Sequence, residues 1–261
     1  MSLPNELTYV VAAAIEAGDA ALGYFESGDM GTRAKGSRDV VTLADTAAER
    51  ILTARLRDAF PRDGIVGEEG TGIPSSGTRT WYVDPVDGTL NFSRSIPVWC
   101  VSVALFDGSV PTLGVVHDPI RRETFTVAPG SDAVCNDAPM SVSGVASLSD
   151  ALVNLTVDFR SATMASGLRD LQAVAPRVLR TRNVGSATLA LAWVAAGRFD
   201  AMLHRFAHPW DYGAGVALIE AAGGRVTDLS GNRYSVSTRS VVATNGRVHD
   251  ALLDILRDGP A

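Results

Sequence analysis

Hydrophobic residues recur at helical spacing over the first 60 positions of the chain. The first periodic set runs from Leu7 to Phe25, and Pro4 lies where the first turn of a helix tolerates proline. A second periodic stretch, Thr42–Phe60, is followed by Pro61, which cannot continue a helix. We therefore predict two amphipathic helices at the start of the chain.

The hydrophobic period changes after the polar stretch Gly67–Thr80, which is rich in Gly, Ser, Thr and Pro and is typical of a loop. Trp81–Val83 and Val98–Phe106 have the apolar, β-branched composition of buried strands. Val110–His117 follows an Asp-Gly turn signal, and Glu123–Ala128 extends the same antiparallel meander. This half of the chain predicts helices layered on an antiparallel sheet, which is an α+β arrangement.

The second half of the chain alternates between strand-like and helix-like segments. The expected strands are Ala151–Val157, Ala201–Leu203, Arg225–Thr227 and Ser240–Thr244, and the expected helices are Ser186–Ala196, Tyr212–Ala222 and Val248–Arg257. This alternation favours an α/β sheet covered by helices. Because the stretch Val142–Ser149 is small and polar, we expect an N-terminal α+β half over residues 1–145 and a C-terminal α/β half over residues 146–261.

Composition and charge narrow the class of protein. The chain has 261 residues, of which 46% are hydrophobic and 20% charged, and this excludes disorder of the whole chain. Acidic residues outnumber basic ones by 29 to 23 with no basic run, so we expect no nucleic-acid partner. No apolar run approaches the ~20 residues of a membrane helix, and residues 1–7 lack the basic region of a signal peptide. We expect a cytoplasmic protein in which Cys100 and Cys135 are reduced.

Acidic residues in loop positions are the most informative feature of the sequence. They are Glu68, Asp84, Asp87 and Asp211, together with Asp45 near the start of the second predicted helix. Each has an ordinary structural explanation. Asp84 and Asp87 are typical turn residues, Asp211 can cap the helix that we expect just after it, and Asp45 suits a first helical turn. Glu68 and its neighbour Glu69 can form a solvated pair in a loop.

Taken together, these acids indicate a metal-dependent phosphate site. Divalent cations such as Mg²⁺ prefer oxygen ligands, and the Asp84-Pro85-Val86-Asp87 turn can present two carboxylates and the Val86 carbonyl to one point. Gly88 permits close approach of the backbone to a ligand, and a helix beginning near Thr89 presents free N–H groups to an anion. Two cations about 3.5–4 Å apart could activate a water molecule and stabilise the leaving oxygen of a phosphate ester.

Two long motifs resemble the inositol monophosphatase family. They are Trp81–Phe92, with the sequence WYVDPVDGTLNF, and Trp210–Gly215, which continues to Glu220–Gly224. Gly67-Glu68-Glu69 and Lys35–Asp45 also resemble family segments in the expected order, and the resemblance covers residues 5 to 257 or so. It implies a layered α-β-α-β-α sandwich, Mg²⁺-dependent hydrolysis of small phosphate monoesters and a homodimer.

The resemblance also implies roles for individual residues. Two or three Mg²⁺ ions are expected on Glu68, Asp84, Asp87, Asp211 and the Val86 carbonyl. Glu68 is expected to orient the attacking water, and Asp45 with Thr89 to polarise it. Backbone N–H groups of Gly88 and Thr89, beside Asp87, are expected to contact the phosphate.

The expected substrate contacts depart from the inositol-specific members of the family. Those members have an acid seven residues before the second-motif aspartate, where this chain has His204, and a neutral histidine offers one donor and one acceptor. The expected contacts are Gly185, Ser186, Ala187, His204 and Arg205, with Val157–Ser161 at their border. The alternatives are a helix cap for the Gly-Ser-Ala segment, a packed or solvated histidine, and an ordinary surface arginine.

The choice of substrate therefore stays open at the level of the sequence. An inositol, polyol or sugar phosphate is the leading expectation, and histidinol phosphate or a sugar bisphosphate is the alternative within the same fold. The alternative from another class is a non-catalytic regulatory protein. All the expected acids are present in this chain, and their presence favours catalysis.

Overall fold

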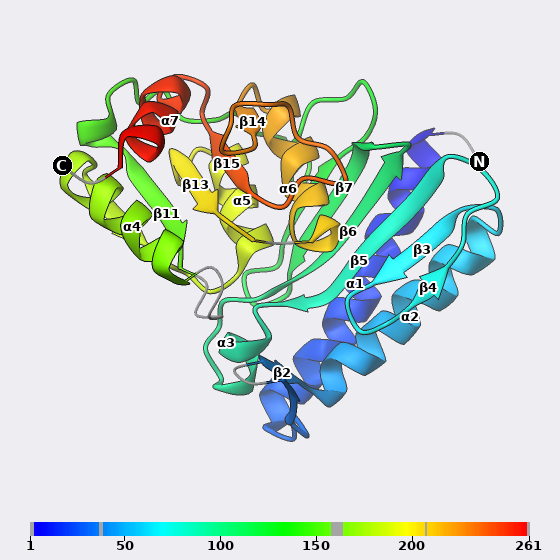
Figure 1. Ribbon diagram of the computed structural model, residues 1–261. Helices are drawn as coiled ribbons and strands as arrows, with labels where there is room; N and C mark the ends of the chain where they lie inside the picture. The colour runs from blue at the N-terminus through cyan, green and yellow to red at the C-terminus, as the bar shows by residue number, and fades with distance from the viewer. Residues whose placement is uncertain (1–2, 37–38, 158–163, 207, 260–261) are drawn as a thin grey trace.

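Two helices and a large sheet form the N-terminal part of the fold. The computed structural model describes residues 3–36, 39–157, 164–206 and 208–259. Helices α1 (Leu3–Ser27) and α2 (Leu43–Ala59) pack side by side on one face of an eight-stranded sheet (Figure 1). Both helices follow the predicted pattern. Helix α2 begins after Thr42, whose side chain caps it, and ends before Phe60.

The eight-stranded sheet has the order β10-β9-β8-β7-β6-β5-β3-β4. Its strands are β3 (Gly64–Gly67), β4 (Gly72–Ile73), β5 (Arg79–Asp87), β6 (Cys100–Asp107), β7 (Val110–Asp118), β8 (Glu123–Val127), β9 (Val134–Cys135) and β10 (Ala138–Pro139). The predicted antiparallel meander is confirmed as β6 to β8, while the antiparallel pairing of β5 with β6 and its parallel pairing with β3 were not anticipated. The expected loop Gly67–Thr80 is wrong in part, because β4 lies within it and β5 begins at its end. A separate hairpin pairs β1 (Arg33–Gly36) with β2 (Asp39–Val41).

The second sheet has five strands in the order β12-β11-β13-β15-β14. They are β11 (Leu152–Thr156), β12 (Arg180–Arg182), β13 (Ala201–His204), β14 (Arg225–Thr227) and β15 (Val241–Thr244). The helices of this part are α4 (Met164–Val174), α5 (Ala187–Ala195), α6 (Pro209–Ala221) and α7 (His249–Asp258), and short 3₁₀ turns span Leu148–Asp150 and Ala175–Arg177. Neither β12 nor α4 was predicted.

Helix α6 begins earlier than the sequence pattern suggested. Its first residue is Pro209, where we expected the helix to begin at Tyr212. Proline is well suited to the first helical position, because its fixed φ fits a helix. The N–H that proline lacks would have no partner within the helix at that position. Asp211 therefore lies inside the first turn, and the expectation that it precedes the helix is wrong.

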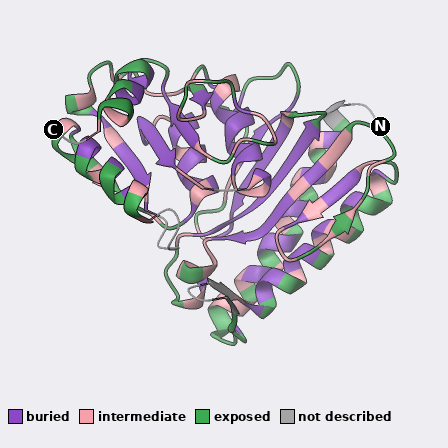
Figure 2. Ribbon diagram, in the orientation of Figure 1, coloured by how far each residue is buried: buried purple, intermediate pink, exposed green. Residues whose placement is uncertain are grey.

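The elements stack in five layers, as the resemblance implied. Apolar residues of α1 and α2, such as Val10 and Leu52, pack on Trp81 and Val103 of the first sheet. Helices α5 and α6 fill the space between the two sheets, and α4 and α7 cover the far face of the second sheet (Figures 1 and 2). The predicted α-β-α-β-α sandwich is confirmed.

The alternation of side chains along β5 decides which layer its acids face. Trp81 and Val83 belong to the cluster under α1 and α2, whereas Tyr82 packs against the cluster around α5 and α6. Because side chains alternate along a strand, Asp84 lies on the same face as Tyr82. The first acid of the long motif therefore faces the middle helical layer.

The two halves share that middle layer. The first sheet ends with β10 and the second begins with β11, and a single apolar cluster includes Phe106 of the first sheet and Met202 of the second. The division near residue 145 stays a prediction. Among the described residues, no helix is both long and apolar enough to cross a membrane.

Candidate active site

The end of β5 brings two of the predicted acids together. Asp84 is 1% exposed and Asp87 is 7% exposed, and a β-bulge lies between them in the pairing of β5 with β6. The Asp84 carboxylate accepts a hydrogen bond from the Val86 N–H at 3.0 Å, which fixes the turn. The bulge breaks the strict alternation of the strand, so both carboxylates lie beside the middle layer.

Gly88 links this turn to the short helix α3 (Thr89–Ser93). Its φ of +103° lies in a region that favours glycine. A Cβ at this position would also lie 3.0 Å from the Val98 carbonyl oxygen, so the backbone approach requires glycine. The helix begins at Thr89, as predicted.

Asp45 lies in the first turn of α2 and also contacts Thr89. Its Oδ2 accepts hydrogen bonds from the N–H and the hydroxyl of Thr42, which makes it part of the capping box of α2. Its Oδ1 lies 3.3 Å from the Thr89 hydroxyl, which donates to it. The same hydroxyl can instead donate its single proton to the Val86 carbonyl oxygen, which lies 3.1 Å away. Burial raises the pKa of Asp45 to about 6, and the hydrogen bonds from Thr42 oppose this shift.

Glu68 reaches the same place from the turn between β3 and β4. Its N–H donates to the Val83 carbonyl at 3.2 Å, next to Asp84 in β5. Burial is the largest cause of a pKa of Asp84 well above its usual range. The negative charges of Glu68, Asp87 and Asp211 raise this pKa further, and so does a side-chain hydrogen bond with Glu68. Because burial and like charges disfavour the ionised form of Asp84, a nearby cation would stabilise it.

Asp211 completes the acidic cluster from the first turn of α6. Its Oδ2 accepts the His208 N–H at 2.6 Å, which helps to cap the helix. The Ser102 hydroxyl of β6 donates to the Trp210 carbonyl at 3.2 Å. This contact fixes the start of α6 against the first sheet, beside Asp84, which pairs with Ser102 across the strands.

The start of α5 binds Asp87 directly. The Ser186 hydroxyl and the Thr188 N–H donate to Asp87 Oδ2 at 2.6 and 2.7 Å, and the Ala187 N–H donates to Oδ1 at 3.3 Å. Ser186 also caps α5, since its Oγ accepts the Leu189 N–H. Burial raises the pKa of Asp87, and these hydrogen bonds oppose the shift. The predicted Gly185-Ser186-Ala187 segment thus lies on the acidic cluster as well as at a helix cap.

The other predicted substrate contacts lie near the end of β13. His204 is 8% exposed and its ring lies edge-on to that of Tyr212, 5.9 Å away. The Arg205 guanidinium binds the Asp170 carboxylate through two nitrogens, one at 2.7 Å. The anion that Arg205 meets within the fold is therefore Asp170. Of the predicted border Val157–Ser161, residues 158–161 lie outside the described part of the chain.

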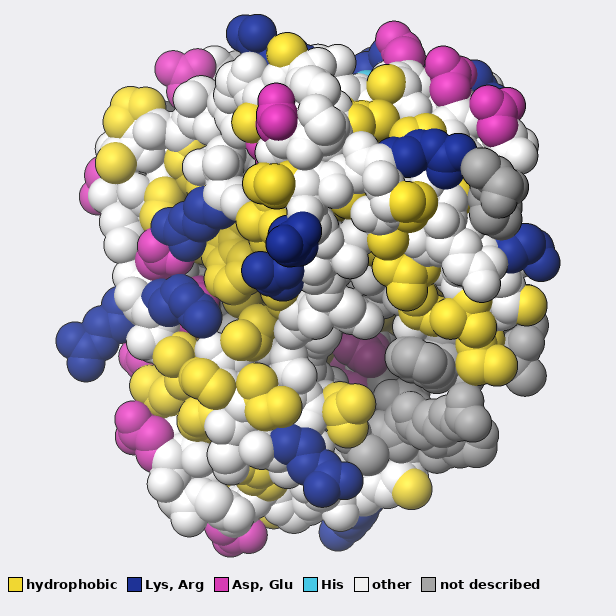
Figure 3. Space-filling model, turned by 90° about the vertical axis from the view of Figure 1, so that its left-hand side faces the viewer, with side chains coloured by type: hydrophobic (Ala, Val, Ile, Leu, Met, Phe, Trp, Pro, Cys, Tyr) yellow, Lys and Arg dark blue, Asp and Glu magenta, His cyan; other side chains and the backbone are white. Residues whose placement is uncertain are grey.

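The donor set fits a hard divalent cation. Carboxylate and carbonyl oxygens are the ligands that Mg²⁺ prefers, and a cation would offset the burial and the negative charges that raise the pKa of Asp84. Within the described residues, no three of these side chains already meet at the spacing of a metal cage. On the face seen in Figure 3, acidic atoms lie deep in a hollow of the surface.

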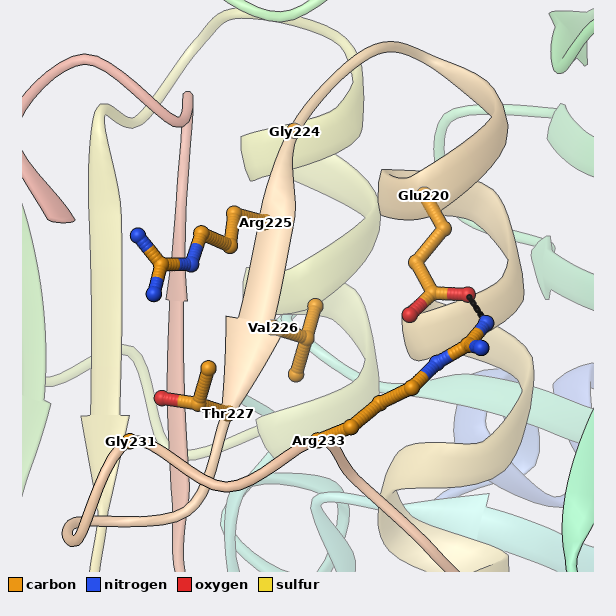
Figure 4. A pocket seen from close by; sticks show the side chains of 7 residues that line it. All are labelled: Glu220, Gly224, Arg225, Val226, Thr227, Gly231 and Arg233. Carbon is orange, nitrogen blue, oxygen red and sulfur yellow. Dashed lines mark hydrogen bonds and ion pairs between the residues drawn. The ribbon is translucent and has the colours of Figure 1, made fainter.

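A second hollow lies beside the end of α6 and the strand β14. It has a volume of about 410 Å³ and is lined by Glu220, Gly224, Arg225, Val226, Thr227, Gly231 and Arg233 (Figure 4). Arg233 pairs with Glu220 at 3.3 Å, and Arg225 pairs with Asp250 at 2.8 Å. None of the predicted site residues lines it.

Comparison with known proteins decides the family. A sequence model of the inositol monophosphatase family matches residues 4–260. The chain belongs to the inositol monophosphatase family. The chain is therefore a phosphoric monoester hydrolase, as the acidic cluster predicted.

Proteins similar to this chain carry names of more than one function. A "Fructose-1,6-bisphosphatase/inositol-1-monophosphatase" from Thermotoga maritima is 35% identical over 85% of this chain and 84% of the relative. A "Nus factor SuhB" from Pseudomonas aeruginosa is 37% identical over the same shares of the two chains. The crystal structure of the extragenic suppressor protein suhB from Bartonella henselae has a TM-score of 0.93 and 32% identity, covering 97% of this chain and 98% of that one.

Several residues of the site were not anticipated from the sequence. Ser102 and Thr188 were missed because their roles depend on contacts between elements far apart in the chain. The Thr188 hydroxyl donates to the Asp211 carbonyl at 2.8 Å, while its N–H binds Asp87. Glu49 was also missed, although its position four residues after Asp45 places it on the same face of α2, and this was visible in the sequence.

Proposed function

We propose that this family member is a Mg²⁺-dependent phosphatase that uses water to hydrolyse a small phosphate monoester of an inositol, another polyol or a sugar. The observation that supports it is the cluster of Glu68, Asp84, Asp87 and Asp211, in which burial and mutual repulsion raise the pKa of Asp84 far above its usual range. Such a cluster is unfavourable without a cation and favourable with one.

The proposed ligands of two or three Mg²⁺ ions are these four acids and the Val86 carbonyl. When bound, the ions supply positive charge that lowers the pKa of water and stabilises the charge on the leaving oxygen. Every other step falls to groups of the chain. Glu68 is proposed to orient the attacking water.

Thr89 and Asp45 are proposed to polarise that water. When the Thr89 hydroxyl donates its hydrogen bond to Asp45, 3.3 Å away, and the Val86 carbonyl binds a metal ion instead, the hydroxyl oxygen can accept a hydrogen bond from the water. With a pKa of about 6, the Asp45 carboxyl group is mainly ionised at neutral pH and can accept the hydrogen bond from the Thr89 hydroxyl. The pair therefore draws proton density away from the attacking oxygen.

The phosphate and the leaving alcohol are proposed to meet different groups. The N–H groups of Gly88 and Thr89 are proposed to donate to phosphate oxygens, beside Asp87. The segment from Gly185 to Ala187 and His204 are proposed to contact the alcohol. The Asp170 carboxylate already binds Arg205. A second phosphate or a carboxylate on the substrate would therefore have to compete with Asp170 for this guanidinium.

The experiment is phosphate release from a panel of monoesters with Mg²⁺ or with EDTA. The panel contains inositol 1-phosphate, histidinol phosphate, fructose 1,6-bisphosphate and other sugar phosphates. We expect turnover that EDTA abolishes and that is strongest on one polyol or sugar monophosphate. Turnover that persists in EDTA would contradict the metal requirement.

The homodimer is also proposed, from the family resemblance, and light scattering tests it.

The second candidate is a regulatory protein on the same fold. The observation that favours it is the relative named a Nus factor, which is 37% identical to this chain. A folded chain that binds Mg²⁺ and releases no phosphate from any member of the panel would support this candidate. The complete acidic cluster favours the phosphatase.

A further inference from the structure

Glu49 is a buried carboxylate that contacts the turn containing Glu68. It lies on α2, is 5% exposed, and belongs to no part of the chemistry described above. Its Oε2 accepts the Glu69 N–H at 2.8 Å, and its Oε1 accepts the Thr71 N–H at 3.0 Å and the Thr71 hydroxyl at 2.7 Å. A charge this deeply buried is unfavourable unless it is hydrogen-bonded, so these contacts strongly favour one position of the turn.

The other N–H groups of the turn are also bonded. The Gly67 N–H donates to the Thr71 carbonyl, the Gly70 N–H to the Gly67 carbonyl, and the Glu68 N–H to Val83 of β5. Glu49 accepts the two that remain. The backbone on both sides of Glu68 is therefore fixed, on one side by β5 and on the other by Glu49.

The close packing of Glu49 explains the glycine at the start of the turn. A Cβ on Gly67 would lie 2.4 Å from Glu49 Oε2 and 2.5 Å from its Cδ. Real side-chain carbons do not approach this closely. The carboxylate thus occupies the space that a side chain at this position would need.

Helix α2 presents Asp45 and Glu49 on one face, one turn apart, and both are buried. Asp45 contacts Thr89 at the start of α3, and Glu49 contacts the turn between β3 and β4. One helix therefore fixes two separate segments of the acidic site relative to each other.

We propose that Glu49 is a positioning residue that holds Glu68 in place for metal binding. The inference rests on the proposed function, in which Glu68 is a metal ligand and orients water. Glu49 acts through the backbone of residues 69–71, so its effect is on the affinity for the cation.

The main test compares the full-length protein with its Glu49→Gln variant. A glutamine keeps the shape of the side chain but replaces one acceptor oxygen by a donor, which faces N–H or hydroxyl donors of the turn. We expect hydrogen exchange at the Glu69 and Thr71 amides to become faster. We also expect the half-saturating Mg²⁺ concentration to rise about ten-fold, for phosphate release and for the Mg²⁺-induced rise in Tm alike. The kcat at saturating Mg²⁺ should change little.

Two controls separate positioning from loss of charge or of stability. Glu16→Gln removes a carboxylate that pairs with Arg55 on the helical surface, and should leave the Mg²⁺ dependence unchanged. Thr71→Val removes the hydroxyl that donates to Glu49 but keeps the Glu49 charge, and it should raise the half-saturating Mg²⁺ concentration. Thr71→Ser keeps a hydroxyl donor and should leave that concentration close to the wild-type value.

The outcomes distinguish this inference from the proposed function. A Glu49→Gln variant with a lower Tm but an unchanged Mg²⁺ half-saturation would overturn the positioning role. Wild-type protein that releases no phosphate, while Glu49→Gln still weakens Mg²⁺ binding, would contradict only the phosphatase.

Discussion

At the scale of single residues, the candidate site is built from groups that stabilise helix ends and also contact other predicted site residues. Asp45 caps α2 and contacts Thr89, and Ser186 caps α5 and contacts Asp87. The sequence showed each residue with two competing interpretations. The structure shows that both contacts are present together, because the site lies where helices begin and where backbone N–H groups have no helical partner.

Thr89→Ala tests the hydroxyl of the proposed polarising pair. The variant removes a hydroxyl that lies 3.3 Å from Asp45, and Thr89 is only half-buried, so the fold should be little affected. We expect kcat to fall about 100-fold or more, which is the range of lost acid–base assistance. Thr89→Ser keeps the donor and should retain most activity. Equal losses in the two variants would show that the methyl group, not the hydroxyl, matters.

Asp84→Asn separates the electrostatics of the empty cluster from those of the metal-bound one. Because burial and neighbouring acids raise the pKa of Asp84, a neutral amide should be tolerated, and the Tm in EDTA should stay the same or rise. The Mg²⁺-induced rise in Tm should disappear, and phosphate release should fall by about 100-fold or more. Differential scanning calorimetry with and without Mg²⁺ measures the first two effects. A marked fall of Tm in EDTA would contradict the assignment.

At the scale of elements, strongly periodic segments were predictable and short ones were not. The helices α1 and α2 and the strands β6 to β8 follow their hydrophobic patterns, whereas only Trp81–Val83 of the longer strand β5 was predicted. The strand β12 has only three residues and is held by its pairing with β11, a contact between distant segments that local pattern does not reveal. Helix α4 contains Gly167, which weakens a helical prediction, yet its packing under the second sheet stabilises it.

Two glycines inside helices provide a matched test of the packing of α6. A Cβ on Gly213 would lie 2.4 Å from the Phe106 ring and 2.8 Å from Ala104 Cβ, whereas Gly23 of α1 has open space around it. Gly213→Ala should lower the free energy of unfolding by about 1–3 kcal/mol through overpacking. Gly23→Ala should raise it by about 0.5–1 kcal/mol, because alanine favours the helix. Urea unfolding measures both, and a stabilising Gly213→Ala would show that α6 is not packed directly on β6.

At the scale of the whole molecule, the candidate site combines elements from both halves of the chain. Asp84 and Asp87 lie on the first sheet, Asp211 lies on α6, and Ser186 joins Asp87 to α5. The sequence motifs predicted which acids come together. They did not predict that the middle helical layer holds Asp87, because this contact spans 99 positions of the chain.

The buried His249 makes the stability of the C-terminal sheet sensitive to acid. Its two ring nitrogens lie 2.9 Å from the Thr227 hydroxyl and 3.0 Å from the Thr244 hydroxyl. Burial lowers the pKa of His249 from 6.5 to about 4, with a further lowering by Arg225 that Asp250 opposes. The folded protein therefore favours the neutral ring. The contribution of the neutral His249 ring to the free energy of unfolding is complete above pH 6.5 and is lost as the pH falls from 6.5 towards 4.

His249→Gln isolates this contribution from the other acid-sensitive groups. The free energy of unfolding of the wild type should fall more steeply than that of the variant between pH 6.5 and 4, with an excess slope approaching about 1.4 kcal/mol per pH unit. Urea unfolding at several pH values measures the difference. Parallel curves would mean that His249 has the same pKa in the folded and unfolded states.

The measurement that tests the central claim most directly is phosphate release by the wild-type protein across a Mg²⁺ titration, with the monoester panel as substrates. We expect saturable, EDTA-sensitive release with a preference for one polyol or sugar monophosphate, because the buried acids are proposed to bind Mg²⁺ beside a site for a small phosphate ester. Release that does not depend on Mg²⁺, or a folded, Mg²⁺-binding protein that releases no phosphate from any of the monoesters, would contradict it.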